Sequence, residues 1–218
     1  MSRAYIKDLA VYLPEQVVDN EEVEARINRV SALMPAGVLQ KLFGIQERRQ
    51  AKEDEQVSDL AAKAACELLQ RHPEEEIDFL IFASACSDLI EPATANIVQH
   101  KLDLHCPAMD MKNACNSFVS AMMAADAMIQ AGFYRRILVV SGEKPSDSIN
   151  YQVRDLDHLK RALAAFTLGD AGAAAILEAS PNESGIVYQK FLTAGQHWPL
   201  CTIPGGGSMY PHDASKNY

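Results

Sequence analysis

Near the middle of the chain stands the segment Pro107-Ala-Met-Asp-Met-Lys-Asn-Ala-Cys-Asn-Ser-Phe118. We predict a short strand over residues 107–112 and a helix over Ser117–Gly132. The helical stretch has almost no polar residues, and a helix that is apolar on every side is expected to be buried. The strand leads through a short turn into this helix, which we expect to open at Cys115.

Strand-like and helix-like segments alternate on both sides of this unit. Ala4–Tyr12 alternates apolar and polar residues, whereas Ile77–Ala83 is nearly all apolar, as in a strand buried on both faces of a mainly parallel sheet. The same reading gives helices at Val57–Leu69 and Ala93–Leu102, a strand at Arg136–Ser141, and a β pair between Ala173–Leu177 and Gly185–Phe191. Such alternation predicts an α/β fold with a layered sheet.

Bulk composition excludes several classes of protein. The chain has 218 residues, 48% of them hydrophobic, and a formal net charge of -9, which argues against a nucleic-acid-binding surface. No apolar run reaches the roughly 18 residues that span a bilayer, so we expect no membrane segment. The five cysteines are odd in number and scattered and form no C-x-x-C pair, which argues against a disulfide framework or a zinc knuckle and favours the cytoplasm.

Cys115 is the strongest candidate for chemistry. A sulfur at a helix start lies near the positive end of the helix dipole, which favours the thiolate. Unpaired backbone N–H groups at such a turn can stabilise an oxyanion on a thioester carbonyl, and the small Ala114 leaves room for an acyl chain. The alternative is that Cys115 is a small buried residue, as most cysteines are.

Six segments in the same order resemble a known family. They are Tyr12-Leu-Pro-Glu-Gln-Val17, Gly44-Ile-Gln-Glu-Arg48, the helix that follows Val57-Ser58, the helix from Glu91-Pro92 to Leu102, Ala114-Cys115 with Phe118, and Leu168-Gly-Asp-Ala-Gly-Ala-Ala-Ala175. Over essentially its whole length, the chain is similar to the N-terminal half of β-ketoacyl-acyl-carrier-protein synthase III-like condensing enzymes of the thiolase superfamily.

The resemblance implies a thiolase-like fold with α/β/α layers. Residues 1–218 would form one nucleophile-bearing domain, the N-terminal half of the usual two-half architecture. The implied activity is a Claisen-type condensation of acyl thioesters, carried by coenzyme A or acyl carrier protein, through an acyl-cysteine and without a cofactor. A homodimer is implied as well, formed by extending the sheet across a two-fold axis.

The family's catalytic His and Asn belong to its C-terminal half, and neither of their segments occurs among these residues. We therefore expect a truncated chain or one completed by a second polypeptide, and a chain that is inactive alone.

Glu91 is a second candidate catalytic residue. It stands 24 residues before Cys115, about where the related head-to-head condensing enzymes carry a glutamate that comes from the partner subunit and acts as base near the cysteine. A carboxylate in an apolar pocket has a raised pKa and can act as a general base. The alternative is an exposed loop glutamate before Pro92.

Three further residues are implied to contact substrate. Ser117 replaces the glycine of the family's A-C-x-G-F pattern and is expected to shape the acyl pocket or add a hydrogen-bond donor, although a bond to its own backbone is equally compatible. Phe118 completes the pattern. Arg161 falls near an expected basic contact, with a solvated charged face as the alternative.

Two residues depart from the family's pattern at positions that concern the acyl donor. One residue of the glycine-rich segment is interpreted as structural. Val38 and Leu42 stand where family members of the fatty-acid type carry a Trp and an Arg that clamp adenine, which weakens coenzyme A as donor. Val38, Ser117 and Glu91 together favour secondary metabolism. Asp170, among small residues, is expected to bond the neighbouring loop.

Two alternative functions stay open. One is an acyltransferase that passes the acyl group to another acceptor, such as an alcohol or an amine. The other is a non-catalytic or half-enzyme subunit that needs a partner chain.

Overall fold

The computed structural model describes residues 3–28, 34–73, 76–182, 184–203 and 207–209. Its contacts divide the chain into two compact units. The sheet unit comprises residues 1–13, 52–144 and 171–191, and the hairpin unit comprises residues 14–51, 145–170 and 192–218. Each unit is described by itself.

A five-stranded sheet forms the centre of the sheet unit. Its strands, in spatial order, are β1 (Ala4–Tyr12), β7 (Ala171–Ala179), β6 (Arg136–Glu143), β4 (Phe79–Ala83) and β5 (Ala108–Met111). β4 runs parallel to β5 and β6, whereas β7 runs antiparallel to β6 and β1. β5 is therefore one edge of the sheet.

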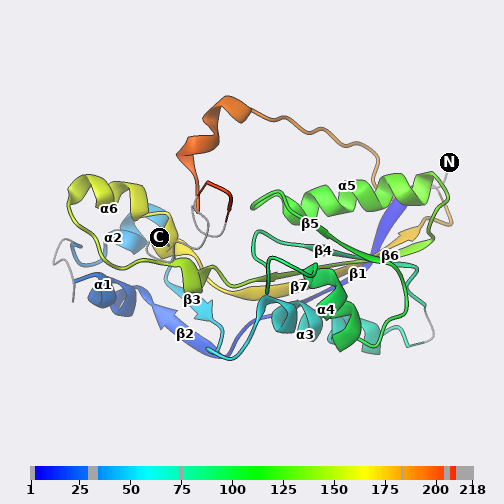
Figure 1. The fold of residues 1–218 in the computed structure, drawn as a ribbon, viewed down its shortest axis with the longest axis horizontal. Coiled ribbons are helices and arrows are strands. Elements are labelled where there is room, and N and C mark those ends of the chain that lie inside the picture. The colour runs from blue at the N-terminus through cyan, green and yellow to red at the C-terminus, as the bar shows by residue number, and fades with distance from the viewer. Residues whose placement is uncertain (1–2, 29–33, 74–75, 183, 204–206, 210–218) are drawn as a thin grey trace. The chain divides into compact units, whose positions relative to one another are not determined.

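Helices cover both faces of this sheet (Figure 1). α3 (Val57–Gln70) and α4 (Thr94–Lys101) pack on one face, and α5 (Ser117–Gln130) packs on the other. Successive side chains of a strand point to opposite faces, so Leu80 and Phe82 join the α3 side while Ile81 joins the α5 side. Both faces of β4 are consequently apolar, and the predicted layered α/β/α fold is confirmed.

Two predictions about strand pairing are wrong. The sheet is mixed and not mainly parallel, because β7 enters antiparallel between β1 and β6. Residues 185–191 form no strand, and β7 pairs with β1 and β6 instead. Both edges of β7 are already occupied, so Gly185–Phe191 has no edge of that strand to join.

The expectation that α5 is buried on every side is also wrong. Ala121, Ala125 and Ile129 are buried against the sheet, but the side chain of Val119 is 52% exposed and that of Met123 is 38% exposed. Low polarity along a helix does not by itself tell whether a second layer covers it. α5 therefore presents an open apolar face within the sheet unit.

In the hairpin unit, strands β2 (Gln16–Asp19) and β3 (Glu47–Gln50) pair antiparallel. Its helices are α1 (Asn20–Asn28), α2 (Val38–Phe43) and α6 (Leu156–Ala162), with short 3₁₀ turns at Pro145–Ser148, Ala165–Thr167 and Gly195–Leu200. A small core that includes Ile27, Leu39 and Phe166 holds these elements together. Within the described ranges, no helix is both long enough and apolar enough to cross a membrane.

A charge cluster around the buried Glu55 ties β1 to α3 and gives a pH prediction. Burial of the Glu55 carboxyl would raise its pKa, but hydrogen bonds from Lys63, the Lys52 N–H and Tyr12 outweigh burial and lower the pKa to about 2. A carboxyl whose pKa is depressed in the folded state stabilises that state above its unfolded pKa and loses this effect as the pH falls.

We expect Glu55→Gln to lower the free energy of unfolding at neutral pH by on the order of 2 kcal/mol. The stability of the wild type should decline as the pH falls from 4.5, the ordinary pKa of a glutamate, to about 2, and the part of this decline due to Glu55 should be missing in the variant. Urea unfolding across this range measures both effects. Glu53→Gln, an exposed neighbour, is the control; equal pH slopes in wild type and Glu55→Gln would contradict the assignment.

Candidate active site

Cys115 lies in a tight turn between β5 and α5. Its side chain is exposed, so the alternative interpretation as a small buried residue is wrong. The helix begins at Ser117, the first residue of the predicted range, so Cys115 precedes the helix and does not open it. Asn116 is a non-helical N-cap residue, and Ala114 has a φ of 47°. The thiol therefore projects from the turn in front of the helix.

Two other cysteines of the sheet unit have environments that suppress reactivity. Burial, together with the nearby Glu143 carboxylate, raises the pKa of the Cys86 thiol to about 12. Burial likewise raises the pKa of Cys106. Because the thiolate is the nucleophilic form, neither of them is a candidate nucleophile.

The topology places the segments that carry Cys115 and Glu91 at one end of the sheet. β4 continues into the loop that contains Glu91 and then α4, whereas β5 continues into the Cys115 turn and then α5. These two parallel neighbours thus send their connections to opposite faces and in opposite directions. Ligands of α/β sheets bind outside the carboxyl ends of strands at such a switch point.

Glu91 is an exposed residue of that loop and precedes Pro92 through a cis peptide bond. Its exposure is what the alternative interpretation, a loop glutamate, requires. The catalytic role of Glu91 stays a prediction.

Hydrogen bonds fix the base of the Glu91 loop. The Asp110 carboxylate of β5 accepts from the backbone N–H groups of Thr94 (2.9 Å) and Ala95 (2.7 Å), at the start of α4. The Thr94 hydroxyl accepts from the Asp88 N–H, and the Asp88 carboxylate accepts from the Ser58 N–H of α3. Asp110 therefore links the nucleophile strand to the segment just after Glu91.

Sequence reasoning missed this role of Asp110. A charged residue between two methionines in a short strand was the available signal, but its partners come from a helix that only the folded chain brings near.

Ser117 and Phe118 occupy the first turn of α5. Ser117 is 2% exposed, and its hydroxyl bonds the backbone of the preceding turn, as the alternative interpretation of this residue anticipated. Phe118 is half-buried and packs with the core on the α5 side of the sheet. Contacts of either residue with substrate stay predictions.

Asp170 is structural, as expected. It is 1% exposed and accepts from the Ala51 N–H (2.8 Å) and the Ser146 hydroxyl (2.6 Å) within the hairpin unit. The preceding Gly169 has no room for a side chain, because an added Cβ would lie 2.8 Å from the Cβ of Arg48. The segment Gly169-Asp170 therefore packs against β3 and the residue that follows it, within the hairpin unit.

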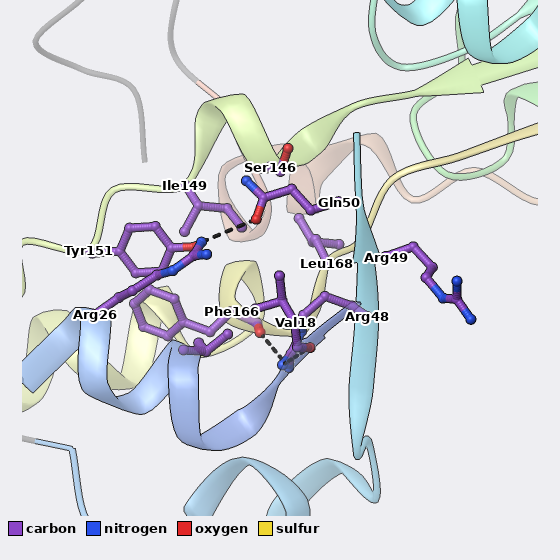
Figure 2. Close-up of a pocket in the computed structure, with 11 residues that line it drawn as sticks. Val18, Arg26, Arg48, Arg49, Gln50, Ser146, Ile149, Tyr151, Phe166 and Leu168 are labelled. Atoms are coloured by element: carbon purple, nitrogen blue, oxygen red, sulfur yellow. Dashed lines mark hydrogen bonds between the residues drawn. The ribbon is translucent and has the colours of Figure 1, made fainter. Parts of the chain in front are cut away.

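A small pocket lies inside the hairpin unit, and the residues that line it include Arg26, Arg48, Tyr151 and Phe166 (Figure 2). Arg26 bonds Gln50 (3.2 Å) and the Tyr151 hydroxyl (3.4 Å), while Arg48 bonds Asn20 (2.9 Å) and the carbonyl of Phe166 (3.0 Å). Burial of the Arg48 guanidinium lowers its pKa from the usual value. Both arginines therefore form hydrogen bonds within the hairpin unit.

Arg161 is exposed in the last turn of α6 and belongs to the hairpin unit, whereas Cys115 belongs to the sheet unit. Its contact with an acyl donor stays a prediction.

Known proteins are similar to this chain over nearly all of the segments described above. Residues 109–195 match the family described as 3-oxoacyl-[acyl-carrier-protein] synthase III. The chain is 33% identical to a β-ketoacyl-[acyl-carrier-protein] synthase III of Aliarcobacter butzleri and 32% identical to that of Neisseria meningitidis serogroup B, with 97% and 94% of the chain covered. It spans 61% of the length of each of these relatives.

Solved structures agree with these relatives. A 3-oxoacyl-(acyl-carrier-protein) synthase III superposes with a TM-score of 0.82 at 27% identity, over 97% of this chain and 61% of the other. A Xanthomonas campestris OleA variant superposes with a TM-score of 0.74 at 30% identity, over 82% of this chain and 55% of the other.

The layered sheet, with a cysteine turn ahead of the helix on one face, has the fold of the thiolase-like condensing enzymes. Within that class, the predicted resemblance to β-ketoacyl-acyl-carrier-protein synthase III is confirmed by the curated relatives over nearly the whole chain.

Proposed function

We propose that the chain is the nucleophile-bearing part of an acyltransferase of the 3-oxoacyl-acyl-carrier-protein synthase III type, acting in the cytoplasm. The observation that carries the proposal is the exposed Cys115 in the turn ahead of α5, in a chain with this family resemblance. The substrates would be acyl thioesters of coenzyme A or of acyl carrier protein.

The reaction has two steps. The Cys115 thiolate attacks the thioester carbonyl, a new C–S bond forms, and the carrier thiolate leaves and takes up a proton. A second thioester then supplies a carbanion, generated by loss of carbon dioxide or of a proton, which attacks the acyl carbonyl and releases Cys115. Glu91 is proposed as the base of this second step, since its loop leaves the strand beside that of the nucleophile.

Two surfaces support proposed partners. β5 is an edge strand of the sheet, so pairing of two β5 strands would extend the sheet across a homodimer. The open apolar face of α5, with Val119 and Met123, is proposed to pack against a further polypeptide segment that supplies the His and Asn. This face also favours the second candidate function, a subunit completed by a partner chain.

Turnover tests the proposal. The chain is incubated with an acyl-coenzyme A and then with a malonyl thioester, and the products are followed by mass spectrometry. A condensed 3-oxoacyl product supports the full proposal, and an acyl adduct without product supports the half-enzyme. Transfer to an alcohol or amine, or no adduct at all, would contradict it.

Glu91→Gln should separate the two steps. The variant is compared with wild type in the preparation that yields condensed product, either the chain alone or the chain with the segment that supplies the His and Asn. We expect formation of the acyl adduct to stay within about twofold of wild type, while its consumption by the second thioester slows by about 10²-fold, the usual contribution of a general base. Rapid-quench mass spectrometry follows both. Glu76→Gln, an exposed glutamate ahead of β4, is the matched control. Unchanged consumption would remove Glu91 from the mechanism.

A further inference from the structure

The turn that carries Cys115 has an unusual backbone conformation. Ala114 has a φ of 47°, in the left-handed region that residues with a Cβ seldom adopt. The Asn113 carbonyl accepts from the Asn116 N–H at 3.0 Å, and the Ala114 carbonyl accepts from the Ser117 N–H at 3.1 Å. The surroundings must hold such a turn for it to persist.

The hydroxyl of Ser117 holds both sides of this turn. It accepts from the backbone N–H of Asn113 at 2.8 Å and donates to the carbonyl oxygen of Ala114 at 2.7 Å. Ser117 is 2% exposed, so its hydroxyl stays with these two partners. One oxygen atom thus bridges the residue that enters the turn and the residue just before the cysteine.

Ser120, one helical turn further along α5, adds a second support. Its hydroxyl accepts from the side-chain amide of Asn113 at 2.8 Å and from that of Asn116 at 3.4 Å. Ser120 is 6% exposed. The residues at both ends of the turn are therefore tied to the buried side of the helix, while Cys115 between them is left exposed.

The arrangement leaves the backbone N–H of Cys115 uncommitted. Among the hydrogen bonds of the described residues, none uses this group. It can therefore donate to a thioester oxygen as negative charge develops there, provided that the turn keeps its shape.

We propose that Ser117 is a positioning residue, whose hydroxyl fixes the Cys115 turn in the conformation that accepts an acyl group. The inference rests on the proposed acyl transfer and adds to it a role for Ser117 that acts through the shape of the turn, apart from any contact with the substrate. Ser117→Ala and Ser117→Gly remove the hydroxyl while the thiol stays in place.

The experiment compares acylation with alkylation. Because Cys66 and Cys201 are also exposed, all variants carry Cys66→Ser and Cys201→Ser. Acylation by an acyl-coenzyme A needs an oriented carbonyl, whereas iodoacetamide needs only an accessible thiol. We expect Ser117→Ala to lower the maximal acylation rate about tenfold or more. The acyl-coenzyme A concentration that gives half of this rate, and the rate of alkylation, should both stay within about twofold of the values for the protein with Ser117.

The matched control is Ser180→Ala. Ser180 is also buried, and its hydroxyl accepts a backbone N–H from Asn182 at 3.3 Å. It follows β7, whose antiparallel direction places it at the end of the sheet opposite Cys115. Its acylation rate should equal that of wild type.

The outcomes separate the two proposals. If wild type is acylated and Ser117→Ala is acylated equally fast, or if Ser180→Ala slows by the same factor, the positioning role is overturned while the proposed function stands. If wild type is alkylated but takes no acyl group, the proposed function fails, and the positioning role fails with it. Faster hydrogen exchange at the Asn113 amide in Ser117→Ala, without slower acylation, would also overturn it.

Discussion

Replacing Cys115 by alanine is expected to abolish acyl transfer, with a loss of at least about 10³-fold, because the acyl-enzyme cannot form without the sulfur. Stability should change little, since the residue is exposed. The rate of thioester consumption and the urea midpoint of the same preparation measure the two effects.

Cys66→Ala is the matched control for this variant. Cys66 is an exposed cysteine of α3 in the same unit, and its replacement should leave the rate unchanged. A rate in Cys115→Ala close to that of wild type would contradict the assignment of the nucleophile.

The second large effect concerns the contact between α3 and the sheet. Gly142 of β6 and Gly172 of β7 are cross-strand partners. A Cβ on Gly142 would lie 1.8 Å from the carbonyl oxygen of Val57, and one on Gly172 would lie 2.0 Å from that of Leu60. Both clashes are with helix backbone, which cannot move aside without displacing α3.

We therefore expect Gly142→Ala to lower the free energy of unfolding by about 3 kcal/mol, the upper end of overpacking effects. In a protein that already carries Gly142→Ala, Gly172→Ala should lower the free energy of unfolding by less than Gly172→Ala does alone, because α3 has already been displaced. Urea unfolding with an unchanged m-value gives both numbers. Gly195→Ala, where an added Cβ meets nothing within 4 Å, is the control. A Gly142→Ala protein as stable as wild type would contradict the close packing.

Local periodicity was enough to predict several elements. The alternation over Ala4–Tyr12 matches β1 residue for residue, and the apolar stripe of Val57–Leu69 matches α3 to within one residue. The α3 pattern arises from burial of one side of a single helix, which a short stretch of sequence records. In β1 the range was predicted but the buried face was not, because Leu9 and Val11 are exposed. The order of strands depends on contacts between distant segments, so the pairing of β7 was not predictable in the same way.

The candidate site shows the same division. Cys115 could be singled out from its turn between a strand and an apolar helix. The bonds that shape the turn could not, because they depend on the hydroxyl orientations of Ser117 and Ser120. Exposure of Val119 was likewise not predictable, since apolar composition is the same whether a helix face is covered or open.

The central claim is that Cys115 accepts an acyl group from a thioester, and peptide mapping after acylation tests it most directly. The chain is incubated with an acyl-coenzyme A, quenched in acid and digested, and the acyl mass is located among the five cysteines. We predict one acyl group, on the peptide that contains Cys115, removable by neutral hydroxylamine. An acyl group on another residue, or an unmodified Cys115 in a folded protein that iodoacetamide still labels there, would contradict the account.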